Sequence, residues 1–175
     1  MAGRFSRRRV LDLKELQTWC AEQGNTCEIG EDCGLTTVKV SIQGPAETPY
    51  EGFQFTLNCQ LPDTFPLSSP SVAFITRIWH PNVEDKSGAI CLDVLLSRWS
   101  PVTSLRSVFE LYVPELLRCA NPEHPINEMA AVMMKSNAKD YFTYAKTHAE
   151  KHAGGQSVDL PNVKDMFPEY YSDYE

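Results

Sequence analysis

Cysteine is the residue type best suited to nucleophilic chemistry in this 175-residue sequence, which contains six of them. A cysteine thiolate can attack a carbonyl carbon and hold the acyl group as a covalent intermediate. Cys20 and Cys59 fall on the apolar faces of a predicted helix and strand, where a thiol is usually a small buried hydrophobe. Cys91 differs, because it follows Gly88 in an irregular segment where the backbone can expose a thiol. The other three lie near turns and show nothing specific: Cys27, Cys33 and Cys119.

Two histidines have the spacing of a metal-binding pair. His148 and His152 are four residues apart, which places them on one face of a helix. No carboxylate or cysteine accompanies them at the spacing that zinc sites use. We therefore interpret the pair as a solvated helix end, and we expect no metal.

The composition limits the classes of protein that these residues can serve. Hydrophobic residues make up 42% of the chain and charged residues 22%, as in a globular domain that can bury a core. Sixteen Lys and Arg against 23 Asp and Glu give a net charge of −7, which argues against direct nucleic-acid binding.

The longest uncharged stretch, residues 64–76, contains two prolines and is too short to cross a bilayer, so we expect no membrane partner. Charged residues at 12, 14 and 15 interrupt any apolar signal core. With no C-x-x-C pair present, we expect free thiols and a cytosolic or nuclear location.

Hydrophobic periodicity predicts the elements that must position these residues. Val10, Leu13, Leu16 and Cys20 recur at helical spacing, which predicts a basic amphipathic helix over residues 6–20. Alternating apolar residues predict sequential antiparallel strands. They lie around residues 38–42, 53–59 and 72–75.

The second half of the chain reads differently. Residues 79–101 show no periodicity, and such a long irregular segment in a compact domain is usually functional. Residues 105–116 fit a core-facing helix that Pro114 should kink. Two further helices are predicted over 127–134 and 138–152, ending before Gly154-Gly155.

The end of the chain is acidic. Residues 156–175 hold five acids against Lys164 alone, with Pro161 and Pro168, a composition that favours a tail over a packed element. The sequence thus predicts a core domain over residues 1–153 and an acidic C-terminal tail over 154–175.

The irregular segment carries His80-Pro81-Asn82, then eight residues, then Cys91-Leu92-Asp93, with Trp99-Ser100-Pro101 soon after. This arrangement resembles the ubiquitin-conjugating enzyme family. Other marks of the family stand around it in the correct order: Gly44-Pro45, Thr48-Pro49-Tyr50-Glu51-Gly52, Leu61-Pro62, Phe65-Pro66, Pro70, and Asn121-Pro122 with Pro125 and Asn127. The resemblance covers roughly residues 5–152. It implies an α+β fold, the UBC-like fold, in which a four-stranded antiparallel meander is flanked by an N-terminal helix, a central helix and C-terminal helices.

The resemblance implies a role for each residue of the motif. Cys91 would be the nucleophile that receives ubiquitin as a thioester, and Asp93 belongs to the same catalytic motif. A substrate lysine then attacks the thioester carbonyl, so a tetrahedral oxyanion must be stabilised. Asn82 has an amide donor for that task, or else it braces a loop. His80 is expected to be structural, packed and bonded to backbone.

Several positions depart from the family pattern. Eight residues separate Asn82 from Cys91 where the family more often has seven, so Glu84-Asp85-Lys86 could alter access to the nucleophile. His124 stands where most members have an acid that helps to deprotonate the incoming lysine, and a neutral imidazole can accept that proton. With Pro114 and the acidic tail, the longer flap resembles the subgroup that ubiquitinates histones in vitro and serves a multi-subunit ligase of helical scaffold proteins.

The resemblance also implies partners: ubiquitin, an activating enzyme, a ligase and protein lysine substrates, with basic, histone-like proteins as one class. The exposed charges of Arg7, Arg8 and Arg9 would meet the activating enzyme. Trp99 would support from below the loops that meet the ligase, which carry Leu67, Pro101 and Val102. In the family, phenylalanine is usual at the position of Leu67, so promiscuous ligase pairing is in doubt.

No metal or small cofactor is implied. The leading interpretation is a conjugating enzyme that passes ubiquitin from Cys91 to lysine. Two alternatives stay open at this point. One is a conjugating enzyme for a ubiquitin-like modifier, and the other is an inactive variant that holds ubiquitin without transferring it.

Overall fold

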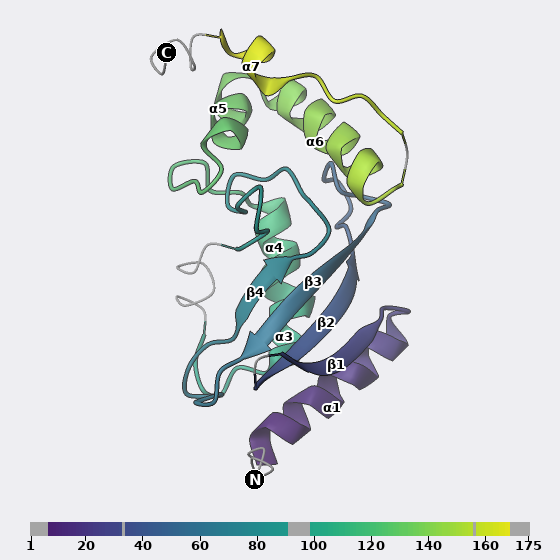
Figure 1. Ribbon diagram of the computed structural model, residues 1–175, viewed down its shortest axis with the longest axis vertical. Helices are drawn as coiled ribbons and strands as arrows, with labels where there is room; N and C mark the ends of the chain where they lie inside the picture. Colours follow the sequence, from purple (N-terminus) through teal and green to yellow (C-terminus); the bar gives the residue numbers. More distant parts are fainter. Residues whose placement is uncertain (1–6, 33, 91–98, 156, 169–175) are drawn as a thin grey trace.

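The computed structural model describes residues 7–32, 34–90, 99–155 and 157–168. A single antiparallel sheet stands at the centre of the fold, with α1 beside its first strand and α5 and α6 beyond one end (Figure 1). None of the described helices is both long and apolar enough to cross a membrane.

The sheet is a meander in the order β1-β2-β3-β4. Its strands are β1 Cys27–Asp32, β2 Leu35–Gln43, β3 Gln54–Leu61 and β4 Ser71–Phe74. The register pairs Val38 with Cys59 and Val40 with Leu57, so the predicted apolar alternations of β2 and β3 meet on one face. These side chains are fully buried. The sequence left β1 unassigned, because five of its six residues are exposed and no apolar alternation marks it.

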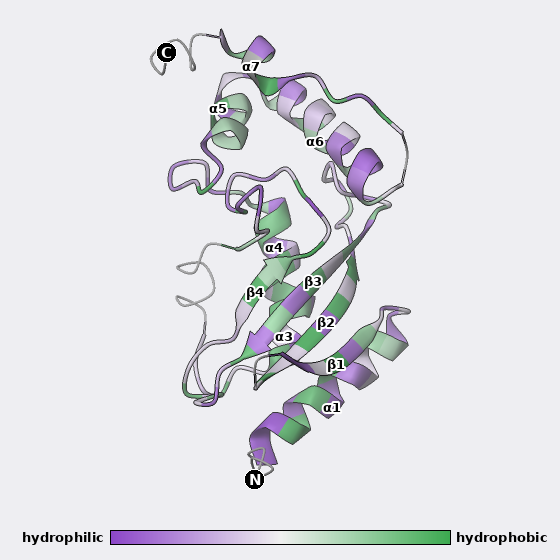
Figure 2. Cartoon of the chain, in the orientation of Figure 1, coloured by the Kyte–Doolittle hydropathy of each residue, from purple (hydrophilic) through white to green (hydrophobic). Residues whose placement is uncertain are grey.

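The central helix lies against the buried face of the sheet and is built from three consecutive parts. These are α3 Leu105–Ser107, a π-helical turn η1 Val108–Tyr112, and α4 Val113–Arg118. Pro114 lies in the first turn of α4, where its missing N–H costs least. The irregularity expected at Pro114 therefore takes the form of a wide turn just before it, in which the N–H of Val113 donates to the carbonyl of Val108. Figure 2 shows hydrophobic residues along the strands of the sheet and along the central helix that packs against it.

Helix α1 spans Arg7–Glu22 and buries Leu13, Leu16 and Cys20 as predicted. Val10, which the period places on the same face, is 38% exposed, and Trp19 is buried. The apolar face of α1 therefore begins one turn later than the sequence suggested.

Two C-terminal helices that contact one another, α5 Glu128–Ser136 and α6 Ala138–His152, match the predicted pair. The side chain of Asn127 accepts from the N–H of Ala130 at 3.0 Å and begins α5.

The expectation of an unpacked tail is wrong for residues 157–168. This segment runs back along α6 and forms the short helix α7, Val163–Met166 (Figure 1). Leu160, Val163 and Phe167 are partly buried against the core. Their three apolar side chains offset the acidic composition from which the prediction was made. The last seven residues, 169–175, lie outside the described part of the chain.

Candidate active site

The loop that carries His80-Pro81-Asn82 is held by buried hydrogen bonds. Nδ1 of His80 accepts from the N–H of Asn82 at 3.0 Å, which leaves Nε2 to donate to the carbonyl of Leu116 at 3.1 Å. His80 is completely buried. The structural role expected of His80, packed and bonded to backbone, is confirmed.

Burial lowers the pKa of His80 from its ordinary value of 6.5 to about 4, although the bond to Leu116 acts in the opposite direction.

The lowered pKa of His80 predicts a dependence of stability on pH. Because His80 is protonated near pH 6.5 in the unfolded chain and only near pH 4 in the folded protein, the unfolded state binds more protons between these values. Stability should therefore be lost as the pH falls through this window, by about 2 kcal/mol at pH 5 from His80 alone. Urea unfolding at pH 7 and pH 5 measures this loss. The matched variant His80→Asn, which has no titrating group, should show a smaller difference between the two pH values. An equal difference in both proteins would contradict the assignment to His80.

Asn82 connects two loops that are far apart in the chain. Its Nδ2 donates to the carbonyls of Asn121 at 2.8 Å and His124 at 3.2 Å, and its Oδ1 accepts from the N–H of Asn121 at 2.7 Å. The carbonyl of Pro81 next to it accepts from the N–H groups of Ile126 and Asn127 at 2.8 and 2.9 Å. Both amide protons of Asn82 are therefore used in bracing the loop of residues 121–127.

The segment before the predicted nucleophile is fixed to β4. The carbonyl of Gly88 accepts from the N–H of Phe74 at 2.8 Å, and the N–H of Ile90 donates to Val72 at 3.3 Å. Gly88 has a φ of 70°, and an added Cβ would lie 1.9 Å from the carbonyl oxygen of Phe74. Only glycine adopts this positive φ without strain and also leaves room for the carbonyl oxygen of Phe74. This explains the glycine three residues ahead of Cys91. Cys91 and Asp93 themselves lie outside the described residues.

The flap with the additional residue is a closed turn. The carboxylate of Glu84 accepts from the N–H groups of Lys86 and Ser87, which lowers the pKa of Glu84, with the bond from Ser87 as the largest cause. Asp85 pairs with Arg77 at 3.1 Å. The extra length is thus accommodated in a structured turn.

Two of the other cysteines are poorly suited to nucleophilic attack. Burial raises the pKa of Cys59, and a hydrogen bond to Cys27 together with burial raises the pKa of Cys20. Both thiols are buried, as their positions on apolar faces predicted. Cys119 is exposed, and Cys33 lies outside the described residues.

His124 lies on the loop that Asn82 braces. Its side chain is exposed, and only its backbone carbonyl is bonded to Asn82. Among the residues that the structure describes, none is bonded to the imidazole, so it can meet solvent or an incoming group at this loop.

The three residues predicted to meet a ligase are exposed on two loops that Trp99 connects. Leu67 is 76% exposed and Val102 84% exposed, and Pro101 is also exposed. Nε1 of Trp99 donates to the carbonyl of Pro66 at 3.0 Å, and its ring packs on Phe65 with centroids 5.5 Å apart. The supporting position expected for Trp99 is confirmed.

The expectation that Arg7, Arg8 and Arg9 all present free charges is wrong for two of them. Arg9 is buried, and its guanidinium donates to the carbonyl of Pro62 at 2.6 Å. Arg8 pairs with Asp12 at 2.9 Å and donates to the carbonyl of Thr103 at 2.9 Å. Arg7 is exposed. Arg8 and Arg9 therefore also attach α1 to the segments next to the two candidate ligase loops. The number of charges in the sequence cannot show this.

Charge reversal at two of these arginines should have different effects. Arg9→Glu removes a charged hydrogen bond from a buried arginine to a partly buried carbonyl, so we expect a loss of about 2 kcal/mol in the free energy of unfolding. Arg7→Glu should leave stability within about 0.5 kcal/mol and slow loading by the activating enzyme at low salt only. Urea unfolding measures the stability of each variant. Initial loading rates at a low and a high salt concentration measure the effect of Arg7→Glu on loading. A stable Arg9→Glu variant, or an unchanged loading rate for Arg7→Glu at low salt, would contradict these assignments.

His148 corrects the interpretation of the histidine pair as a solvated helix end. It is 3% exposed and packs on Trp79, with ring centroids 6.1 Å apart, and on His152 at 4.4 Å. The spacing of the two histidines could not show that Trp79, from a distant segment, covers this end of α6. Among the described residues no three His, Cys, Asp or Glu side chains gather as metal ligands would.

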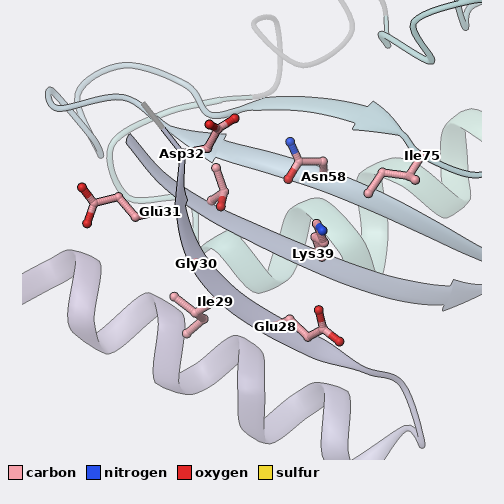
Figure 3. Close-up of a pocket in the computed structure, with 9 residues that line it drawn as sticks. Glu28, Ile29, Gly30, Glu31, Asp32, Lys39, Asn58 and Ile75 are labelled. Carbon is pink, nitrogen blue, oxygen red and sulfur yellow. The ribbon is translucent and has the colours of Figure 1, made fainter. Parts of the chain in front are cut away.

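The outer face of the sheet is polar and carries a hollow of about 430 Å³ (Figure 3). Glu28, Lys39 and Asn58 are among the side chains that line it. Neither Asn82 nor His124, the two predicted catalytic residues that the structure describes, lines this hollow. We therefore place the candidate active site at the braced loops of residues 80–90 and 121–127.

Comparison with known proteins agrees with this architecture. Residues 11–149 match the family model for ubiquitin-conjugating enzymes. Ubiquitin-conjugating enzyme E2 5 of Arabidopsis thaliana is 40% identical over 148 residues, which cover 85% of this chain and 77% of the plant protein. Human ubiquitin-conjugating enzyme E2 K is 39% identical over 123 residues, 70% of this chain and 61% of that protein.

The structures agree as well. The solved E2 domain of a Toxoplasma gondii ubiquitin conjugating enzyme superposes with a TM-score of 0.72 at 36% identity, covering 84% of this chain and 99% of that domain. The four-stranded sheet and its helices are therefore the UBC fold that the sequence predicted. The chain belongs to the ubiquitin-conjugating enzyme family, transferases that act through a cysteine thioester with ubiquitin, an activating enzyme and ligases.

Proposed function

We propose that Cys91 accepts ubiquitin from the activating enzyme and passes it to a substrate lysine. The observation that carries this proposal is the chain leading into residue 91, which is bonded to β4 through Gly88 and Ile90 and runs beside the Asn82 loop through the Val83–Ile90 bridge. A thiolate at position 91 attacks the thioester carbonyl carbon and releases the thiolate of the activating enzyme. The acyl group stays activated as a second thioester. A lysine amine then attacks it, loses a proton and releases Cys91.

We propose a bracing role for Asn82. With both amide protons bonded to the carbonyls of Asn121 and His124, an oxyanion role would require one of these bonds to break. The brace instead holds the loop that carries His124 in place. Asp93 is proposed as part of the same site from the motif alone.

His124 is the proposed proton acceptor for the incoming lysine, because its imidazole is exposed on the braced loop. A neutral imidazole can accept the proton that the lysine loses and an imidazolium cannot, so discharge to free lysine should slow as the pH falls. Single-turnover discharge from pre-loaded enzyme between pH 6 and 8 measures this, with His124→Asp as the matched variant. We expect wild type to lose more of its rate than His124→Asp on going from pH 8 to pH 6. Identical profiles would remove His124 from the proton transfer.

The ligase is proposed to dock on Leu67, Pro101 and Val102. Their exposure on two loops joined by Trp99 supports this, since exposed apolar side chains grouped on a rigid support are suited to binding a partner. We further propose the subgroup that serves a multi-subunit helical-scaffold ligase and acts on basic, histone-like substrates, for which the net charge of −7 is suitable. The division into a core of residues 1–153 and a tail of 154–175, and a location in the cytosol or nucleus, belong to the same proposal.

The experiment that tests the function is a loading assay. Activating enzyme, ATP and the full chain are incubated with ubiquitin or with one of several ubiquitin-like modifiers, each with its own activating enzyme. Gels run with and without reductant then show any thioester. We expect a reductant-sensitive adduct with ubiquitin. An adduct with another modifier alone would replace ubiquitin in the proposal, and no adduct with any would indicate an inactive ubiquitin-binding variant.

A further inference from the structure

Two thiols from different elements meet where α1 connects to β1. Cys20 lies in the last turn of α1 and is 1% exposed, and Cys27 is the first residue of β1 and is half-buried. The two side chains are hydrogen-bonded to one another. Both pack in the hydrophobic core, so the contact is not a chance meeting of mobile surface groups.

Hydrogen bonds hold the backbone on both sides of the connecting turn. The N–H of Asn25 donates to the carbonyl of Cys20 at 2.8 Å, and Gly24 supports the reversal of the chain with a φ of 68°. The N–H of Thr26 donates to Oγ of Ser41 at 2.7 Å, and its carbonyl accepts from the N–H of Ser41 at 3.0 Å. The turn therefore holds the two cysteines side by side in the folded protein.

The two thiols are suited to different steps of an oxidation. The hydrogen bond from Cys20 lowers the pKa of Cys27, although burial acts in the opposite direction. Cys27 is also the more accessible of the two. Cys20 is buried against it, which is the position of a resolving thiol, the group that attacks an oxidised cysteine beside it.

We propose that Cys20 and Cys27 form a peroxide-sensitive dithiol, which closes to a disulfide and fastens the end of α1 to β1. The sulfur of Cys27 attacks one oxygen of hydrogen peroxide, the O–O bond breaks, and the leaving hydroxide takes the thiol proton as water. The sulfur of Cys20 then attacks the sulfenic acid on Cys27. The S–O bond breaks, and the second hydroxide takes the proton of Cys20. Two thiols are thus oxidised, and one peroxide is reduced to two waters.

The second step is favoured by the same contact. The largest cause that raises the pKa of Cys20 is its hydrogen bond to Cys27, and this cause ends when Cys27 is oxidised. The attack is also intramolecular, between groups that the turn already holds together. Rotation of the side chains must then bring the sulfurs to about 2.0 Å. None of these steps depends on ubiquitin transfer at Cys91.

The test treats the reduced full chain with a small molar excess of hydrogen peroxide, blocks the remaining thiols in acid, and maps disulfides by mass spectrometry. A protease that cleaves after glutamate separates Cys20 from Cys27 at Glu22, and Cys27 from Cys33 at Glu28. We expect the peptide of residues 16–22 linked to that of residues 23–28 as the main disulfide product. Dithiothreitol should release it.

Three variants assign the roles of the two thiols. Cys27→Ser should give no linked peptide and keeps a small polar group at a half-buried position. Cys20→Ala removes the resolving thiol, so sulfenic acid at Cys27 should accumulate and its adduct with dimedone should increase several-fold. The matched control is Cys119→Ser, which removes an exposed thiol and should form the linked peptide as wild type does.

The disulfide should also fasten the fold. Relative to Cys27→Ser treated in the same way, the oxidised wild-type chain should unfold at a temperature several degrees higher, because the bond restricts the unfolded chain. An unchanged difference between the two proteins before and after oxidation would overturn the fastening of α1 to β1.

Three mapping results would overturn the dithiol itself. The first is the absence of the linked peptide after peroxide treatment. The second is a main product that joins Cys27 to Cys33 or Cys59, or to a second copy of the chain. The third is an equal dimedone adduct at Cys27 in wild type and in Cys20→Ala, which would show that Cys20 does not resolve the sulfenic acid.

Discussion

Cys91→Ala is expected to form no adduct with ubiquitin under conditions in which the wild-type chain is fully loaded. The reason is chemical, since alanine has no atom that can hold the acyl group. Cys91→Ser should give a slower adduct that resists reductant, because a hydroxyl forms an oxyester and is a weaker nucleophile at neutral pH. Gels of loading reactions, run with and without reductant, measure both outcomes.

The matched control for this prediction is Cys119→Ala, which removes an exposed thiol located near the braced loop. It should load at the wild-type rate. Normal loading of Cys91→Ala would overturn the assignment of the nucleophile, and loss of loading in Cys119→Ala alone would transfer the role to that thiol. Thermal unfolding of each variant excludes misfolding as the cause.

Asn82→Ala is expected to reduce the free energy of unfolding by about 3 kcal/mol, because it removes three partly buried hydrogen bonds and leaves the N–H of Asn121 without its acceptor. The loop of residues 121–127 should loosen, and discharge from Cys91 to lysine should slow with it. Urea unfolding measures the first effect, and single-turnover discharge from pre-loaded enzyme measures the second.

Asn82→Asp separates bracing from oxyanion stabilisation. The carboxylate keeps the acceptor for the N–H of Asn121 but places negative charge beside the carbonyls of Asn121 and His124. If Asn82 braces the loop, both variants should lose stability and should also discharge ubiquitin to lysine more slowly. Slow discharge with wild-type stability in Asn82→Ala would instead favour a direct oxyanion role.

The sequence by itself determined the elements whose pattern is local. The alternation of Phe55, Leu57 and Cys59 predicted β3, and the matching alternation in β2 predicted its partner. The order of helices and strands and the motif around Cys91 were enough to indicate the UBC fold. These features are visible because side-chain period and turn residues are set within a few positions of the chain.

Only the tertiary structure decided which distant segments contact one another, and so which residues are buried and which groups are hydrogen-bonded. Strand β1 is mostly exposed, so it forms through its pairing with β2 rather than through a pattern of its own. Arg9 and His148 look like surface residues in the sequence, yet Pro62 and Trp79, more than fifty residues away along the chain, cover them. The partners of Asn82 lie 39 and 42 residues further on. Burial and hydrogen-bond partners depend on which segments meet in space, and local residue types do not record that.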